Sequence, residues 1–215
     1  MMSGILSPAF LQAAGRAGKE KFSGIKLFTL TTDPEISSIT GTDIVVKTVK
    51  NGESKTETYA SLEGDTLSIS ADKNTEITIT GTITECEIGS NATFTRISVT
   101  NTALTSLSCS SCYALQELNL STNTALTSLS CSYCSSLQEL NLSTNTALTS
   151  LDCSYCYALQ ELKYPATNSD ISTAIANAIT NATAADGTVY TDSDGAYYST
   201  IADAATAKGW TIEQL

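Results

Sequence analysis

Hydrophobic residues recur along the middle of the chain with a period of 22 residues. From Asn101 the chain reads NTALTSLSCSSCYALQELNLST, then NTALTSLSCSYCSSLQELNLST, then NTALTSLDCSYCYALQELKYPA. Each copy divides into two 11-residue halves that share the pattern L-x-x-L-x-[LC]-x-x-[NC]. Alternation of apolar and polar residues is typical of short strands with one buried face, and a fixed period of about 20 to 50 residues indicates a solenoid.

A weaker form of the same template extends upstream of the three copies. Ile83 and Cys86 fit the first half of the template, and Phe94 and Ile97 fit the second. A solenoid needs about three or more repeats to bury a continuous hydrophobic face, and this chain has six half-units that keep the template. We therefore expect the solenoid to cover residues 77–166.

The flanking segments predict caps for the two ends of the stack. Residues 25–76 contain β-rich stretches separated by Asp-Pro, Asn-Gly and Gly-Asp turn signals, which predicts a β-rich N-terminal cap or a small β domain. Residues 167–215 predict an α/β C-terminal cap, with one helix that follows Pro165 and a second between the short strands TVYT and WTIEQL. Residues 1–24 are expected to form a helical or disordered N-terminal segment.

The motif L-x-x-L-x-C-x-x-[NC] at a spacing of 21 to 22 residues resembles the cysteine-containing leucine-rich-repeat proteins of bacterial surfaces, of the internalin J type and of gut Bacteroidetes. The resemblance implies a right-handed solenoid with a concave parallel sheet, and many members of the family are adhesins. It also implies a ladder of unbonded cysteines in the core. By position, this inward ladder would be Cys109, Cys131 and Cys153. The corner asparagines would be replaced by Cys112, Cys134 and Cys156.

The predicted fold class is therefore a leucine-rich-repeat solenoid, parallel and β-rich, with 22-residue repeats between an N-terminal β-rich cap and a C-terminal α/β cap. Charge and composition restrict its function. The formal net charge is -11, which argues against nucleic acid and anionic membranes as partners. Histidine is absent, so the commonest general base and metal ligand is missing, and we expect no enzymatic activity. No run of about 18 apolar residues occurs, so no membrane insertion is expected.

The start of the chain does not indicate a compartment. It has no basic region before its apolar stretch and does not fit a signal peptide. The protein is expected at the bacterial cell surface or secreted if a leader precedes this sequence, and cytoplasmic or virion-associated otherwise.

Three C-x-x-C pairs, 18 residues apart, match a zinc pattern in spacing. Zinc requires four thiolates directed at one ion, whereas the template places the first cysteine in a core position and the second at a corner. Leu120 and Asn123 take the same two positions in the other half-repeat, so buried free thiols are expected. Disulfides between turns would need an S–S torsion that stacked side chains rarely reach, and a redox pair would need an exposed thiolate. We predict no metal and no cofactor.

Tyrosines beside the cysteine corner are the leading candidates for binding. Tyr133 and Tyr155 share one repeat position, and Tyr113 and Tyr157 share another. Exposed aromatic side chains on a rigid scaffold suit glycan and protein recognition, because tyrosine offers a large contact area at low entropy cost. The alternative is that the rings only pack on one another or close the gap between the strand and the convex face. Serine at the equivalent positions of other turns shows that neither position requires an aromatic residue.

A second candidate column consists of Glu117, Glu139 and Glu161, whose like charges about 5 Å apart would favour a cation or a basic partner. A solvated polar face is the alternative. Together the patterns predict a non-enzymatic, adhesin-like scaffold for protein–protein or protein–glycan recognition. A structural component of a larger surface or phage assembly is the second interpretation, and a zinc or redox C-x-x-C protein is the third.

Overall fold

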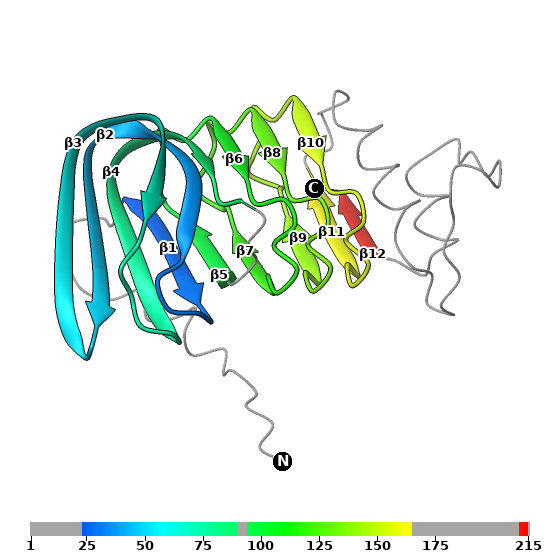
Figure 1. Ribbon diagram of the computed structural model, residues 1–215. Coiled ribbons are helices and arrows are strands. Elements are labelled where there is room, and N and C mark those ends of the chain that lie inside the picture. The colour runs from blue at the N-terminus through cyan, green and yellow to red at the C-terminus, as the bar shows by residue number, and fades with distance from the viewer. Residues whose placement is uncertain (1–22, 90–93, 165–210, 215) are drawn as a thin grey trace, which may run out of the picture.

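The computed structural model describes residues 23–89, 94–164 and 211–214. In these residues the chain forms a parallel β-solenoid of about three turns, and the repeat spacing is about 22 residues. The turns stack in sequence order (Figure 1). The predicted repeat spacing and parallel stacking are confirmed. None of the described residues belongs to a helix that is long and apolar enough to cross a membrane.

The strands fall into a long and a short class. The longer strands come first in the chain and are β1 (Gly24–Thr29), β2 (Glu35–Lys50), β3 (Glu53–Ser68) and β4 (Thr75–Glu87). The shorter strands follow, and they are β5 (Phe94–Val99), β6 (Ser106–Ser108), β7 (Glu117–Asn119), β8 (Ser128–Ser130), β9 (Glu139–Asn141), β10 (Ser150–Asp152), β11 (Glu161–Tyr164) and β12 (Thr211–Gln214).

The turns carry parallel strands on two faces. One face is formed by the end of β4 followed by β6, β8 and β10. On the other face β5 pairs with β7, and β9 pairs with β11, which pairs with β12. Each 22-residue copy therefore supplies two strands, one from each 11-residue half, because both halves have the same alternation. The family resemblance implied one concave sheet, and the second parallel face differs from that expectation.

Leucine at the centre of each short strand faces the core. Leu107, Leu129 and Leu151 lie opposite one another in register and are buried. The residues on either side of each leucine point outward, as expected for a strand with one buried face. One cluster of buried hydrophobic side chains extends through the described residues from Ile25 to Tyr164.

Buried asparagines hold one corner of each turn. The side-chain amide of Asn123 donates a hydrogen bond to the carbonyl of Asn101 at 2.6 Å, and that of Asn145 donates to the carbonyl of Asn123 at 2.8 Å. The Asn145 amide also reaches the carbonyl of Leu120 at 3.2 Å. These side chains satisfy backbone oxygens that would otherwise be buried without a partner.

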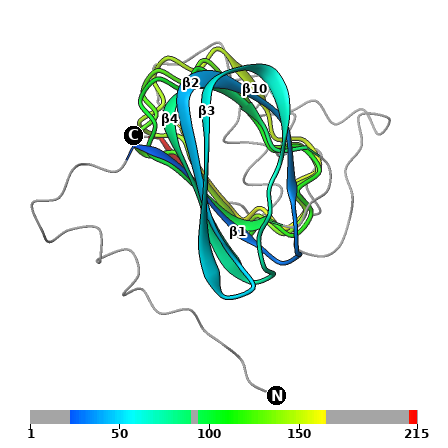
Figure 2. The same ribbon diagram turned by 60° about the vertical axis from the view of Figure 1, so that its left-hand side comes forward.

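The N-terminal strands join the two faces. β1 lies between β4 and β5 and pairs antiparallel with both, so the sheet continues from one face to the other around a single core (Figure 2). β2 pairs antiparallel with β4 and with β3. Parallel pairing begins at Glu85, inside β4, so the solenoid boundary predicted at residue 77 falls within one strand. At the other end β12 supplies the strand expected in WTIEQL, whereas both predicted helices, TVYT and residues 1–22 lie outside the described residues.

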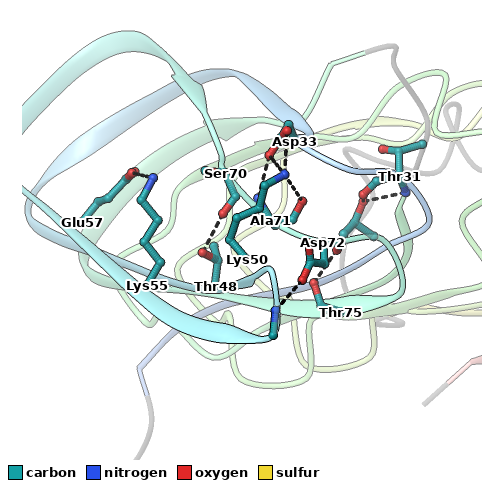
Figure 3. A network of polar contacts seen from close by, with 12 residues as sticks. Thr31, Asp33, Thr48, Lys50, Lys55, Glu57, Ser70, Ala71, Asp72 and Thr75 are labelled. Carbon is teal, nitrogen blue, oxygen red and sulfur yellow. Dashed lines mark hydrogen bonds and ion pairs between the residues drawn. The ribbon is translucent and has the colours of Figure 1, made fainter.

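A network of polar contacts ties the loops of the N-terminal strands together (Figure 3). The Lys50 ammonium lies 2.8 Å from both carboxylate oxygens of Asp33, and one of these oxygens accepts the backbone N–H of Ala71 at 3.0 Å. The carboxylate of Asp72 accepts the N–H of Gly52 at 3.1 Å. The hydrogen bond from Lys50, followed by that from Ala71, holds the pKa of Asp33 below its ordinary value.

Candidate functional site

The corner that leads from the first face to the second has an unusual backbone. Ser111, Tyr133 and Tyr155 occupy the same position in successive turns, and their φ angles are 62°, 60° and 58°. The left-handed region costs an ordinary L-residue about 1 to 2 kcal/mol, and glycine and asparagine adopt it most easily. We call these three residues the first tyrosine column.

Backbone hydrogen bonds between turns fix this corner. The N–H of Ser111 donates to the carbonyl of Ser132 at 2.7 Å, and the N–H of Tyr133 donates to the carbonyl of Ser154 at 2.9 Å. Two residues later in each turn is a second tyrosine column, which consists of Tyr113, Ser135 and Tyr157. Both columns are therefore presented on a backbone with a defined conformation.

The rings of the two columns meet at the third turn. Tyr133 and Tyr155 stack with ring centroids 4.4 Å apart and planes 15° from parallel, and Tyr155 meets Tyr157 edge-on at 6.1 Å. Despite these contacts, Tyr133 is 42% exposed, Tyr157 is 41% exposed and Tyr113 is 52% exposed. Tyr155 is half-buried between its neighbours. The rings thus pack on one another and still present surface to solvent.

The neighbouring tyrosines affect the phenol of Tyr133. The pKa of the Tyr133 phenol is raised, first by loss of solvent around it and then by the phenol of Tyr155, with smaller contributions from Tyr157 and Tyr113. At physiological pH the Tyr133 phenol is therefore neutral, and it acts as both hydrogen-bond donor and acceptor. We call the two columns together the tyrosine corner.

The glutamates lie at the first positions of β7, β9 and β11, on the second face. Glu117 lies 3.6 Å from the guanidinium of Arg96, and Glu161 lies 3.1 Å from the ammonium of Lys163. Glu139 is opposite Glu161 in the parallel register. Cations of the same chain thus sit at both ends of the column, which favours a solvated polar face over an ion site.

The cysteines of the repeats are all buried, and all seven in the chain are free. The Cys134 thiol donates to the carbonyl of Cys109 at 3.2 Å, and the Cys156 thiol donates to the carbonyl of Cys131 at 3.2 Å. In both of these hydrogen bonds the donor and the acceptor are 25 residues apart in the sequence. The hydrogen bond from the Asn145 amide to the Leu120 carbonyl has the same separation. Corner cysteine and corner asparagine therefore serve the same backbone position.

Burial also determines the chemistry of these thiols. It raises the pKa of Cys86 and of Cys112 to about 12, and the pKa of Cys131 is raised first by its hydrogen bond with Cys156 and then by burial. Neutral, buried thiols are poor nucleophiles and poor metal ligands. No group of three or more histidine, cysteine, aspartate or glutamate side chains is placed to hold a metal ion within the described part of the chain.

A row of serines on the first face, which the sequence analysis did not single out, leads to the tyrosine corner. The Ser110 hydroxyl lies 2.6 Å from that of Ser130 and 3.2 Å from that of Ser132. Ser110 and Ser132 directly precede the first tyrosine column in their turns. The alternation S-L-S-C-S indicates such a row, because every second residue lies on the side of the strand opposite the core leucine, although Ser132 itself is buried.

The site itself is the basis for assigning a function. No protein-family model, no curated protein and no solved structure matches the chain. The features that remain are the tyrosine corner, the serine row beside it and the partly paired glutamates.

Proposed function

We propose that this protein is a non-enzymatic recognition scaffold that binds a protein or glycan ligand at the tyrosine corner. The observation that carries the proposal is the stacked pair Tyr133 and Tyr155 on left-handed backbone, in which the Tyr133 ring is exposed. Aromatic residues are enriched where proteins bind partners, because one rigid side chain offers apolar area together with a polar group.

The backbone cost of these tyrosines argues for a role beyond folding. Serine occupies the same position at Ser111, so the turn forms without a ring. Stacking of two aromatic rings contributes about 0.5 to 1.5 kcal/mol, which at most offsets the strain of one tyrosine in this conformation. Strained residues of this kind concentrate at functional sites.

The repeat template supports the finer assignment of the scaffold to the leucine-rich-repeat type, with the adhesin-like role that this family often has. The corner hydrogen bonds shared by asparagine and cysteine also support it. We further propose that β1, β2 and β3 act as the N-terminal cap, since they cover the first turn with antiparallel strands. The net charge of -11 supports a partner other than nucleic acid.

The test compares wild-type protein with the double variant Tyr133→Ser and Tyr155→Ser. Both are screened against an oligosaccharide array and against purified fibronectin, laminin and type I collagen. We expect the wild type to bind at least one member and the double variant to lose about tenfold or more in affinity for it. Serine is a matched replacement because Ser111 already occupies this position, and thermal unfolding checks that the fold is kept.

The matched control is the double variant Glu117→Gln and Glu139→Gln on the second face. Binding that disappears in this control and survives the tyrosine substitutions would move the site to the glutamates and contradict the proposal. A wild-type protein that binds no member of either panel would also count against it.

A further inference from the structure

The stack of the first tyrosine column runs along the solenoid axis and stops at Tyr133. Tyr133 and Tyr155 take the same position in successive turns, and their rings are nearly parallel at 4.4 Å. One face of the Tyr133 ring is therefore covered by Tyr155, and the other is directed toward the turn of Ser111. Of the aromatic contacts among the described residues, Tyr133 takes part only in the one with Tyr155.

Exposure agrees with an open face. Tyr133 is 42% exposed. Tyr155 has the same backbone position but rings on two sides, and it is less exposed, at a half-buried level. Ser111 has no ring to cover Tyr133, and Tyr113 in the same turn as Ser111 is 52% exposed. A flat ligand that lay on this face would take the place that a third tyrosine would occupy in the column.

The corner segments around this face are uncharged and carry hydroxyl groups. No charged residue occurs in residues 110–115, 132–137 or 154–159, the three corner segments that carry the tyrosines. The half-buried Ser110 hydroxyl borders the first column and lies 3.2 Å from the hydroxyl of Ser132, which is itself buried. The exposed phenols of Tyr113 and Tyr133, together with Ser110, can both donate and accept hydrogen bonds, so they match the rim of a neutral ligand that also carries hydroxyls.

We infer that the face of Tyr133 directed at Ser111 binds a neutral pyranose ring of a glycan. The apolar C–H face of a pyranose covers an aromatic ring, and its hydroxyls meet the phenols and the Ser110 hydroxyl at the edge. A charged ligand would lose its hydration without gaining a counter-charge. An aromatic side chain of a protein would cover the same ring but would not match the hydrogen-bonding phenols at its edge as a ring of hydroxyl groups does. This inference rests on the proposed function and specifies its ligand.

The test fills the open position with the residue that the column already uses elsewhere. The variant Ser111→Tyr extends the stack by one ring and is expected to fold, because tyrosine takes this backbone conformation at Tyr133 and Tyr155. Maltohexaose, cellohexaose and mannohexaose are titrated calorimetrically into wild type and variant. We expect at least one to bind wild type and to bind Ser111→Tyr about tenfold or more weakly. Ser111→Ala, the control, is expected to bind within about twofold of wild type.

The outcomes separate this inference from the proposed function. If Tyr133→Ser with Tyr155→Ser loses ligand and Ser111→Tyr keeps it, the open face is not the subsite, although recognition by the corner stands. If only the protein ligands bind and Ser111→Tyr blocks them, the occupant is a protein side chain and the pyranose assignment is wrong. No binding of any hexasaccharide by wild type also overturns it. If neither variant loses any ligand, both proposals fail.

Discussion

The N-terminal strands and the repeat turns share one core but are held together differently. β2 and β3 are 16 residues long and pair antiparallel along their length, with ion pairs such as Lys50–Asp33 and Lys55–Glu57 at their surface. The strands of the repeats from β6 to β10 are three residues long. Strands this short are not stable alone, so each turn depends on its neighbours.

In the repeats, uncharged groups at the corners replace the long ladders. Asparagine amides and cysteine thiols donate to buried carbonyls of the preceding turn. The Thr127 and Thr149 hydroxyls make exposed hydrogen bonds to carbonyls of the preceding turn along the first face. Repetition of one small, neutral contact in every turn thus provides the stabilisation that long hairpin strands provide in the N-terminal region. We therefore expect the two regions to respond differently to thiol reagents, core substitutions and pH.

The largest expected effect is the protection of the thiols. All seven cysteines are buried, and six of them belong to the repeat turns, so native protein should react with a thiol reagent such as dithionitrobenzoate at a negligible rate at pH 8. In denaturant the same protein should give seven thiols per chain. Rapid reaction of several thiols in native protein would mean that the turns open separately from the N-terminal strands.

Core truncation should separate the two regions next. Leu129→Ala, in the middle turn, should lower the free energy of unfolding by about 2 to 5 kcal/mol, as should Leu27→Ala in β1, since both side chains are buried. Hydrogen exchange is the discriminating measurement. We expect Leu129→Ala to increase exchange mainly in the adjoining turns, because contacts in a solenoid are between neighbours. An equal increase along β2 and β3 would refute this difference.

A smaller loss is expected for the buried amide of Asn145. Its replacement by alanine removes the donor to the carbonyls of Leu120 and Asn123 and should cost about 1 to 3 kcal/mol, measured by denaturant unfolding. Asn119, which is exposed and bonds Ser121 locally, provides the control. Asn119→Ala should cost less than about 1 kcal/mol, and equal losses would contradict the role of the buried column.

The smallest effect should be confined to the N-terminal strands and to acid pH. The pKa of Asp33 is lowered mainly by its hydrogen bond with Lys50. The charged carboxylate therefore stabilises the fold when the pH is above the ordinary pKa of 3.8. That stabilisation is lost as the pH falls through the lowered pKa. In Asp33→Asn the stability should therefore fall less steeply with acidification than in wild type. Chemical unfolding at several pH values measures this slope, and identical slopes would argue against the ion pair.

The stacked turns were readable from the sequence because their contacts repeat at a fixed separation. The position of β1 could not be predicted from the sequence. Its Ile25 pairs with Ile79 and Val99, and no local turn signal marks either partner. A turn was predicted from the Gly-Asp signal at Gly64, yet the chain continues there as one strand. Gly64 has a φ of 78°, which lets β3 bend without ending.

For the site, alignment of the copies was enough to place Tyr133 and Tyr155 in one column. The left-handed backbone that carries the stacked rings was not indicated by residue type, because tyrosine rarely adopts this conformation. The same limitation applies to the partners of the glutamates. Arg96 lies outside the regular copies, so its approach to Glu117 follows from the fold of the first turn.

The strict register of the copies has a consequence for how such a gene can change. Each 22-residue copy closes its own turn and offers the next copy the same hydrogen-bonding pattern, so duplication or deletion of a whole copy leaves the strands on either side intact. Near-identical copies also recombine readily. The number of turns, and the choice of tyrosine or serine at the corner of each turn, can therefore vary between related genes while the core residues stay the same.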